Sequence, residues 1–166
     1  FRVVKLIDAY RGSGHLFTKT NPVRRRRQYS PTLDIKNFGL HQDDLTTVFS
    51  AGDIIGIGAA TLADIIIHLE RIYCESIGME YMYIRHPERI NWIQKWINKN
   101  GNHPKFTNDQ KKQILKKLNE AVTFEQFLHT KYVGQKRFSL EGGESLIPAL
   151  DALIETAALD GVEQFV

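Results

Sequence analysis

The sequence predicts a mainly α-helical fold, a small helical bundle with at most one short hairpin. Apolar residues recur at intervals of three and four over most of the 166 residues, which is the pattern of one buried face on successive helices. Two such stretches follow capping signatures, Thr61–Asp64 and Thr107–Gln110. Strand character is confined to Met79–Ile84 and to the last residues, Val162–Val166.

Composition places the chain among ordinary globular proteins, with 42% hydrophobic and 25% charged residues. The one cysteine, Cys74, lies among apolar residues, so we expect a buried thiol and a reducing compartment. The longest apolar run, 54–67, is interrupted by glycines and an aspartate, so we expect no membrane span. Phe1 is not an initiator methionine and no signal-peptide pattern follows it, so we expect upstream residues to have been removed.

The first helix is expected close to Phe1, where four apolar residues have helical spacing: Val3, Val4, Ile7 and Tyr10. Gly12 and Gly14 should end it by adopting positive backbone angles. A long extended loop near 18–40 follows, because two prolines interrupt it and its periodicity is weak. The acids at 43–44 then favour the start of a further helix.

The clearest helix follows Thr61 and is expected to run to Gly78. Its apolar stripe consists of Leu62, Ile65, Ile66, Leu69, Ile72 and Tyr73. Met79–Ile84 is rich in aromatic residues and would supply the short hairpin. Proline is tolerated in the first turn of a helix, so the next helix should begin at Pro87 and stop at Asn100–Asn102.

A further helix begins at the Thr107 capping box, and we expect a bend after Ala121 before its apolar face continues. Four large aromatic side chains should supply much of the buried area of the bundle: Trp92, Trp96, Phe124 and Phe127.

The chain changes character after Tyr132. Loops with glycines precede a helix at Leu146–Ala158, and the apolar strand Val162–Val166 comes directly after it. A helix followed by such a strand is how a parallel α/β domain begins, and a lone strand cannot form a sheet. We therefore expect a helical domain at 1–130 and, at 131–166, a junction loop with the first helix and strand of a truncated α/β domain.

The net charge of +3 and the pI near 9.0 come largely from the run Arg24–Arg27. Prolines on either side favour extended chain, so we expect an exposed basic loop. The alternative is a free-standing helical interaction module that binds an acidic partner through Arg24–Arg27. The chain lacks a broad basic face with aromatic platforms, so we expect no nucleic-acid partner.

Residues that carry chemistry are scattered. The six histidines lack metal-ligand spacing, so we expect no metal site. Gly56 and Gly58 precede a helix without a preceding strand, which indicates helix entry rather than a phosphate loop. Ser13 lacks a catalytic framework, so we expect no catalytic residue in this chain.

The segment 131–144 concentrates charge beside glycines and supplies the candidate binding residues: Lys136, Arg137, Glu141, Gly142, Gly143 and Glu144. Its two cations could hold an anion, or could pair with the two glutamates and fix the loop. Pairing is favoured because ion pairs in folded loops outnumber ligand clamps.

Two stretches, Phe127–Tyr132 and Lys136–Leu150, closely resemble the decarboxylating component of 2-oxoglutarate dehydrogenase, the thiamine-diphosphate-dependent, succinyl-transferring enzyme. The resemblance extends upstream over nearly the whole chain, through Ala9–Leu16, Leu33–Asp34, Phe38–Leu40, Thr61–Leu62, Ile72–Cys74 and Ile77–Met82. The basic run Arg24–Arg27 departs from many relatives, whose loop is less charged.

The resemblance implies that the parent protein decarboxylates 2-oxoglutarate and transfers succinyl to a lipoyl group in the tricarboxylic acid cycle. It implies thiamine diphosphate and magnesium in the parent and none bound to this fragment. The family's substrate-contacting histidine-arginine-glycine-arginine motif would follow Val166, and its diphosphate-binding motif and activating glutamate would come later still. The fragment is therefore expected to be an inactive N-terminal scaffold of the first α/β cofactor-binding domain. A preference for 2-oxoadipate, or release of the semialdehyde, is left open, because the residues that decide it would lie beyond this chain.

The resemblance also implies partners and a compartment. The parent would be a homodimer that associates with the lipoyl succinyltransferase component. It would lie in the bacterial cytoplasm, or in the mitochondrial matrix of a eukaryote, and the cytoplasm is favoured.

Overall fold

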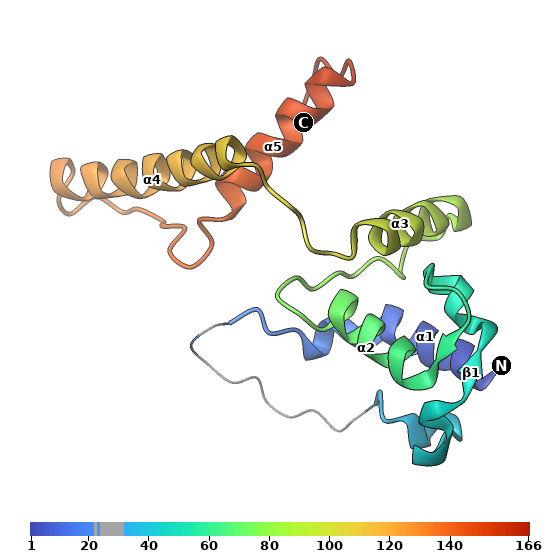
Figure 1. The fold of residues 1–166 in the computed structure, drawn as a ribbon. Coiled ribbons are helices and arrows are strands. Elements are labelled where there is room, and N and C mark those ends of the chain that lie inside the picture. Colours follow the sequence, from blue (N-terminus) through green and yellow to red (C-terminus); the bar gives the residue numbers. More distant parts are fainter. Residues whose placement is uncertain (22, 24–31) are drawn as a thin grey trace. The chain divides into compact units, whose positions relative to one another are not determined.

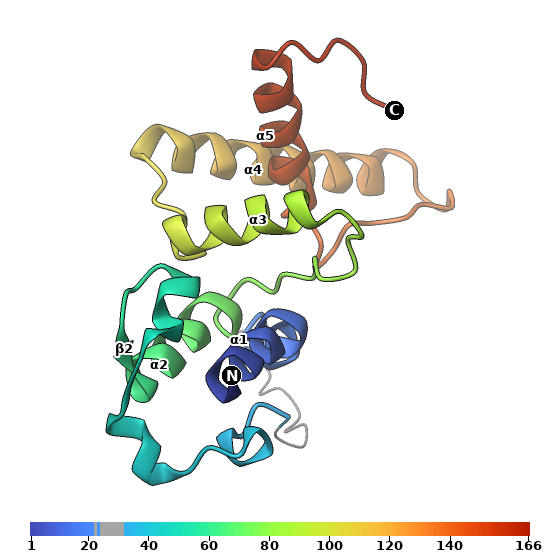
Figure 2. The same ribbon diagram turned by 90° about the vertical axis from the view of Figure 1, so that its right-hand side faces the viewer.

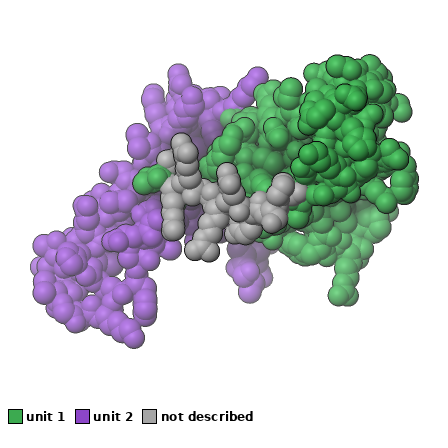
Figure 3. Space-filling view, turned by 90° about the horizontal axis from the view of Figure 1, so that it is seen from below, with its two compact units in different colours: residues 1–104 green, residues 105–166 purple. Residues whose placement is uncertain are grey.

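The computed structural model describes residues 1–21, 23 and 32–166, and Arg24–Arg27 lie outside them. The described chain forms two compact units, Phe1–Pro104 and Lys105–Val166, which Figure 3 colours separately. Along the sequence, the boundary between the units after residue 104 lies 26 positions before the predicted domain boundary after residue 130. That boundary concerns the domains of the parent protein and stays a prediction.

The prediction of a mainly α fold is confirmed, since helices dominate both units (Figure 1). The first unit contains α1 (Arg2–Ser13), η1 (Gly14–Phe17), η2 (Ile35–Phe38), η3 (Gln42–Thr46), β1 (Val48–Phe49), η4 (Ser50–Ile55), β2 (Ala60–Thr61), α2 (Leu62–Tyr73) and α3 (Pro87–Asn100). The second contains α4 (Asn108–Lys131) and α5 (Leu146–Leu159).

The core of the first unit lies between α1 and α2, which run side by side (Figures 1 and 2). Its buried members are Val3, Leu6, Ile7, Tyr10, Leu40, Ile55, Leu62, Ile65, Leu69, Ile72, Tyr73, Tyr81 and Ile97. Thr61 caps α2 as predicted, because its side chain accepts a hydrogen bond from the amide of Asp64. The apolar stripe predicted for this helix therefore becomes the centre of the core.

The first helix ends differently from the prediction. Gly14 is right-handed, with φ of −58°, so it does not end α1 through a positive angle. A β-carbon at Gly14 would lie 2.6 Å from the Cβ atom of Tyr73. Gly14 is therefore required for the close approach of α1 to α2, and Gly12 simply lies within the helix.

The short hairpin is formed by other residues than those predicted. Val48 and Phe49 pair antiparallel with Thr61 and Ala60, whereas 79–84 contain no strand. In that stretch Tyr81 is buried, and its hydroxyl lies 3.1 Å from the hydroxyl of Tyr73. Of the two tyrosines in 79–84, Tyr81 is thus buried against Tyr73 of α2 whereas Tyr83 is 79% exposed, and neither takes part in strand pairing.

The helix α2 also ends earlier than expected, at Tyr73 instead of near Gly78. The side chain of Asn102 donates hydrogen bonds to the carbonyl oxygens of Ile72, at 2.8 Å, and Ile77, at 3.2 Å. A residue beyond α3 therefore satisfies backbone groups that the end of α2 leaves open. The predicted stop at Asn100–Asn102 is confirmed by Gly101, whose φ is +62°.

The prediction that four aromatic residues supply much of the buried area is wrong. Exposed fractions are 65% for Trp92, 51% for Trp96, 61% for Phe124 and 55% for Phe127. On α3 the isoleucine face, which includes the fully buried Ile97, points into the core instead.

In the second unit α5 crosses α4, which is one continuous helix without the predicted bend (Figures 1 and 2). Its capping box at Thr107 and Gln110 is confirmed. The predicted strand Val162–Val166 is not formed, because no neighbouring strand in the described residues offers hydrogen-bond partners.

Two smaller expectations concern Cys74 and the membrane. Cys74 is a half-buried free thiol, and burial raises its pKa to about 11, which favours the unreactive protonated form. Among the helices of the described residues, none has the length and apolar character needed to cross a bilayer.

The close approach at Gly14 gives a stability prediction. We expect Gly14→Ala to destabilise the first unit by about 1–3 kcal/mol, because the new methyl group overlaps Tyr73. Gly12→Ala is the matched control, since a β-carbon there meets nothing within 4 Å. It should stabilise α1 by about 0.5–1 kcal/mol. Urea unfolding followed by fluorescence of Trp92 and Trp96 measures both, and equal midpoints for the two variants would contradict the packing described.

His68 makes the stability of the first unit depend on pH. Burial lowers its pKa below the ordinary value of 6.5; a hydrogen bond with the backbone of Ile55 opposes this, and nearby Arg71 adds to it. The unfolded chain therefore binds the proton more readily. The stability that neutral His68 contributes to the folded unit is fully present above pH 6.5 and is lost as the pH falls through the lowered pKa. Between about pH 7.5 and about pH 5, the free energy of unfolding should fall less in His68→Gln than in the unsubstituted chain. His103→Gln is the control, because it removes an exposed imidazole from the same unit. An unchanged pH dependence in His68→Gln would argue against this role.

Candidate functional site

The predicted loop 131–144 lines a hollow of about 360 Å³ in the second unit. The hollow lies between the C-terminal half of α4 and the loop that leads to α5. Its walls are formed by Val122, Glu125, Gln126, Leu128, His129, Arg137, Phe138, Ser139, Glu141 and Glu144. Three of the six predicted candidates, Arg137, Glu141 and Glu144, are therefore brought together, and Lys136, Gly142 and Gly143 lie in the same loop.

Glu125 fixes the loop to α4. One carboxylate oxygen accepts a hydrogen bond from the hydroxyl of Ser139, at 3.1 Å, and the other accepts from the amide of Leu140, at 2.8 Å. The sequence interpretation missed Glu125. The available signal was its place between Ala121 and Leu128 on the half-buried face of α4, where a charged side chain needs hydrogen-bond partners.

The basic residues of the loop do not form the predicted pairs with Glu141 and Glu144 within the described chain. The Arg137 guanidinium contacts Nδ1 of His129, and the Lys136 ammonium lies 5.4 Å from the ring centre of Phe138. A guanidinium only donates, so Nδ1 of His129 is the acceptor in this contact. Both cations of the loop therefore lie beside aromatic or imidazole rings instead of beside Glu141 and Glu144.

Glycine and glutamate together shape the turn before α5. Gly142 has φ of +83°, in the left-handed region, and its amide donates to the carboxylate of Glu144 at 3.1 Å. The amide of Gly143 donates to the carbonyl oxygen of Leu140 at 2.6 Å. These glycines thus serve the turn, and Glu144 caps it rather than pairing with a cation.

The hollow contains three carboxylates, those of Glu125, Glu141 and Glu144, against one guanidinium. The hydroxyl of Ser139 donates to Glu125 and His129 is engaged by Arg137, so no nucleophile is paired with a base. Across the described residues, no cluster of three His, Cys, Asp or Glu side chains could hold a metal ion. The arrangement can bind through hydrogen bonds but has no catalytic set.

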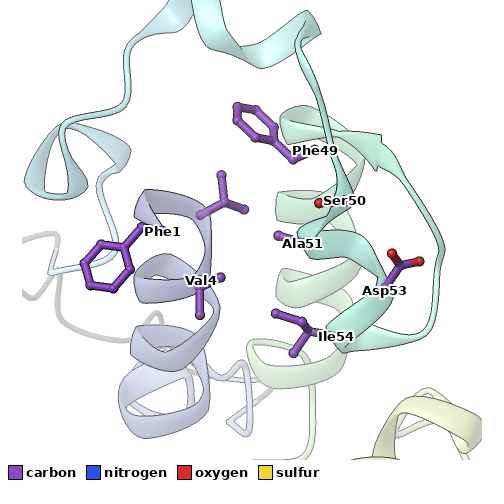
Figure 4. Close-up of a pocket in the computed structure, with 8 residues that line it drawn as sticks. Phe1, Val4, Phe49, Ser50, Ala51, Asp53 and Ile54 are labelled. Atoms are coloured by element: carbon purple, nitrogen blue, oxygen red, sulfur yellow. The ribbon is translucent and has the colours of Figure 1, made fainter.

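A second hollow, of about 370 Å³, lies in the first unit between α1 and the segment from β1 to η4 (Figure 4). Its walls are mostly apolar, and the carboxylate of Asp53 points away from α1 (Figure 4). Nearby, Gly56 and Gly58 have φ of +78° and +74° and form turns before α2, as the interpretation as helix entry predicts. This hollow also lacks a catalytic set.

Comparison with known proteins relates nearly the whole chain to one group of enzymes. The multifunctional 2-oxoglutarate metabolism enzyme of Mycolicibacterium vanbaalenii is 44% identical over 168 residues, which cover 99% of this chain and 13% of that protein. The 2-oxoglutarate dehydrogenase E1 component of Cupriavidus necator is 42% identical, with 98% and 17% covered. That of Coxiella burnetii is 37% identical, with 97% and 17% covered. No protein-family model matches the chain.

The chain therefore spans less than a fifth of the length of the curated relatives it matches. Identity at this level over 97–99% of the chain confirms the resemblance that the sequence predicted.

The role of Glu125 is testable by hydrogen exchange. In Glu125→Ala the amide of Leu140 loses its charged acceptor, so we expect its exchange to accelerate by about tenfold or more. Gln126→Ala changes another side chain of the same hollow and leaves both bonds of Glu125 in place. Equal protection of Leu140 in the two variants would show that Glu125 does not hold the loop.

Proposed function

We propose that this chain, a homologue of 2-oxoglutarate dehydrogenase E1 components over nearly its whole length, is a helical part of a longer protein of that family. The observation that carries the proposal is identity of 37–44% over 97–99% of the chain to proteins so named or named for 2-oxoglutarate metabolism. The parent then oxidatively decarboxylates 2-oxoglutarate and passes the succinyl unit to a lipoyl group.

Thiamine diphosphate, held through magnesium, supplies the carbanion chemistry in the parent. The described residues of this chain do not fit that group. They gather no group of three His, Cys, Asp or Glu side chains that could hold a metal ion such as magnesium. In the hollow at 131–144, Arg137 is engaged with His129, Ser139 with Glu125, and Glu144 with the loop backbone. We therefore assign no catalytic step to this chain and give it the role of a scaffold.

The scaffold role rests on two features of the described chain. The first unit has a continuous apolar core, and the loop 131–144 is tied to α4 by Glu125. The core and the hydrogen bonds of Glu125 each fix the position of a part of the chain, and neither places a reactive group beside a substrate. The homodimer, the lipoyl succinyltransferase partner and a cytoplasmic location belong to the same proposal.

The activity of the parent is tested with the full-length protein, 2-oxoglutarate, thiamine diphosphate, magnesium and an artificial electron acceptor. We expect turnover that depends on thiamine diphosphate, and none from residues 1–166 alone. Replacing 2-oxoglutarate by 2-oxoadipate under the same conditions shows which acid is preferred. Absence of turnover with every 2-oxo acid would refute the proposed activity.

A further inference from the structure

The second unit has no buried core of its own. Every residue of 105–166 remains at least partly exposed, whereas thirteen hydrophobic side chains are buried among the described residues of the first unit. Its two helices contact each other, yet large apolar side chains stay open to solvent on both. Exposure of this much apolar surface to water is unfavourable, and such surfaces usually bind another part of the chain or another molecule.

The most regular part of this surface is a leucine seam on α5, formed by Leu146, Leu150 and Leu153. Spacings of four and three residues place the three side chains on one face of the helix. Their exposed fractions are 49%, 45% and 56%. The seam is therefore an ordered apolar stripe rather than a set of scattered residues.

The side of α5 that carries Asp151 packs against α4. The carboxylate of Asp151 accepts from the Lys117 ammonium at 2.7 Å and from the Gln113 side chain at 3.4 Å, so this side faces α4. The ion pair raises the pKa of Lys117 and lowers that of Asp151. Each seam residue lies roughly 100° or more around the helix axis from Asp151, so α4 does not cover the seam.

Charge argues against a second copy of the chain as the cover. Residues 138–166 contain no Lys or Arg, and their acidic residues are Glu141, Glu144, Asp151, Glu155, Asp160 and Glu163. Pairing two such segments would bring like charges together. A cover from elsewhere in the same polypeptide is not required to carry the same charges, and it has the advantage of a high effective concentration.

We infer that the leucine seam is a docking surface for the part of the parent polypeptide outside residues 1–166. This rests on the proposed function, because the relatives have more than four-fifths of their length outside the matched segment. The seam joins this chain to the remainder of the enzyme through apolar burial, and α4 holds α5 in the orientation that presents the seam.

The test measures how accessible the seam is in the full-length parent. Leu150→Cys and, separately, Leu153→Cys are labelled with a maleimide, and the labelled peptide is quantified by mass spectrometry. Glu155→Cys is the matched control, since Glu155 is exposed on the same helix and lies outside the seam. We expect the seam cysteines to react at least about tenfold more slowly than the control, which corresponds to about 1.4 kcal/mol or more of protection.

Equal labelling rates at the seam and at the control position in the full-length parent would overturn the inference. The chain 1–166 is labelled alone over a range of concentrations, where we expect fast reaction at the seam throughout. Protection that grows with its concentration would assign the seam to a second copy and also overturn it. The readout needs no substrate, so a protected seam in a parent that does not use 2-oxoglutarate would refute the proposed activity alone.

Discussion

The packing of α1 against α2 is the contact on which the rest of the first unit depends. It requires a residue without a side chain at Gly14, because the Cβ atom of Tyr73 occupies the space beside it. Once the two helices are this close, Tyr73 reaches the hydroxyl of Tyr81 and the loop after α2 is held against the core. Ile55, the last residue of η4, is buried in the same core as the apolar residues of α2. One close approach thus sets the position of several irregular segments.

The second unit is held by a different kind of force. Its loop is fixed by hydrogen bonds to the Glu125 carboxylate, and its helices are joined by the ion pair of Lys117 with Asp151. Exposed ion pairs and hydrogen bonds contribute less to stability than apolar burial does. The second unit therefore depends mainly on polar contacts, and Ser139 and Glu144 serve the local geometry of its loop.

Helix starts were predictable from local chemistry, whereas orientation and short strands were not. The helix starts after Thr61 and Thr107 could be predicted because capping depends on residues only three positions apart in sequence. The pairing of Val48 with Thr61 involves strands of two residues, too short to show alternation in sequence. Trp92 was assigned to the core because of its size, but the isoleucines of α3 occupy the helix face that packs against the core. In the candidate site, the loop was found from its glycines and charges. Its anchor, Glu125, was missed because the anchoring contact joins residues 14 and 15 positions apart.

The hydrogen bonds from Asn102 to backbone carbonyl groups at and after the end of α2 constrain the length of α3. Asn102 must lie just beyond α3, in the left-handed conformation with φ of +51°, for its amide to meet the carbonyl oxygens of Ile72 and Ile77. Ile97 fixes the rotation of the same helix in the core. Inserting or deleting one residue between these two positions would turn Asn102 by roughly 100° away from its acceptors. Evolutionary length variation in this part of the chain should therefore be confined to the stretches before Pro87 and after Asn102, while the helix itself keeps a constant number of residues.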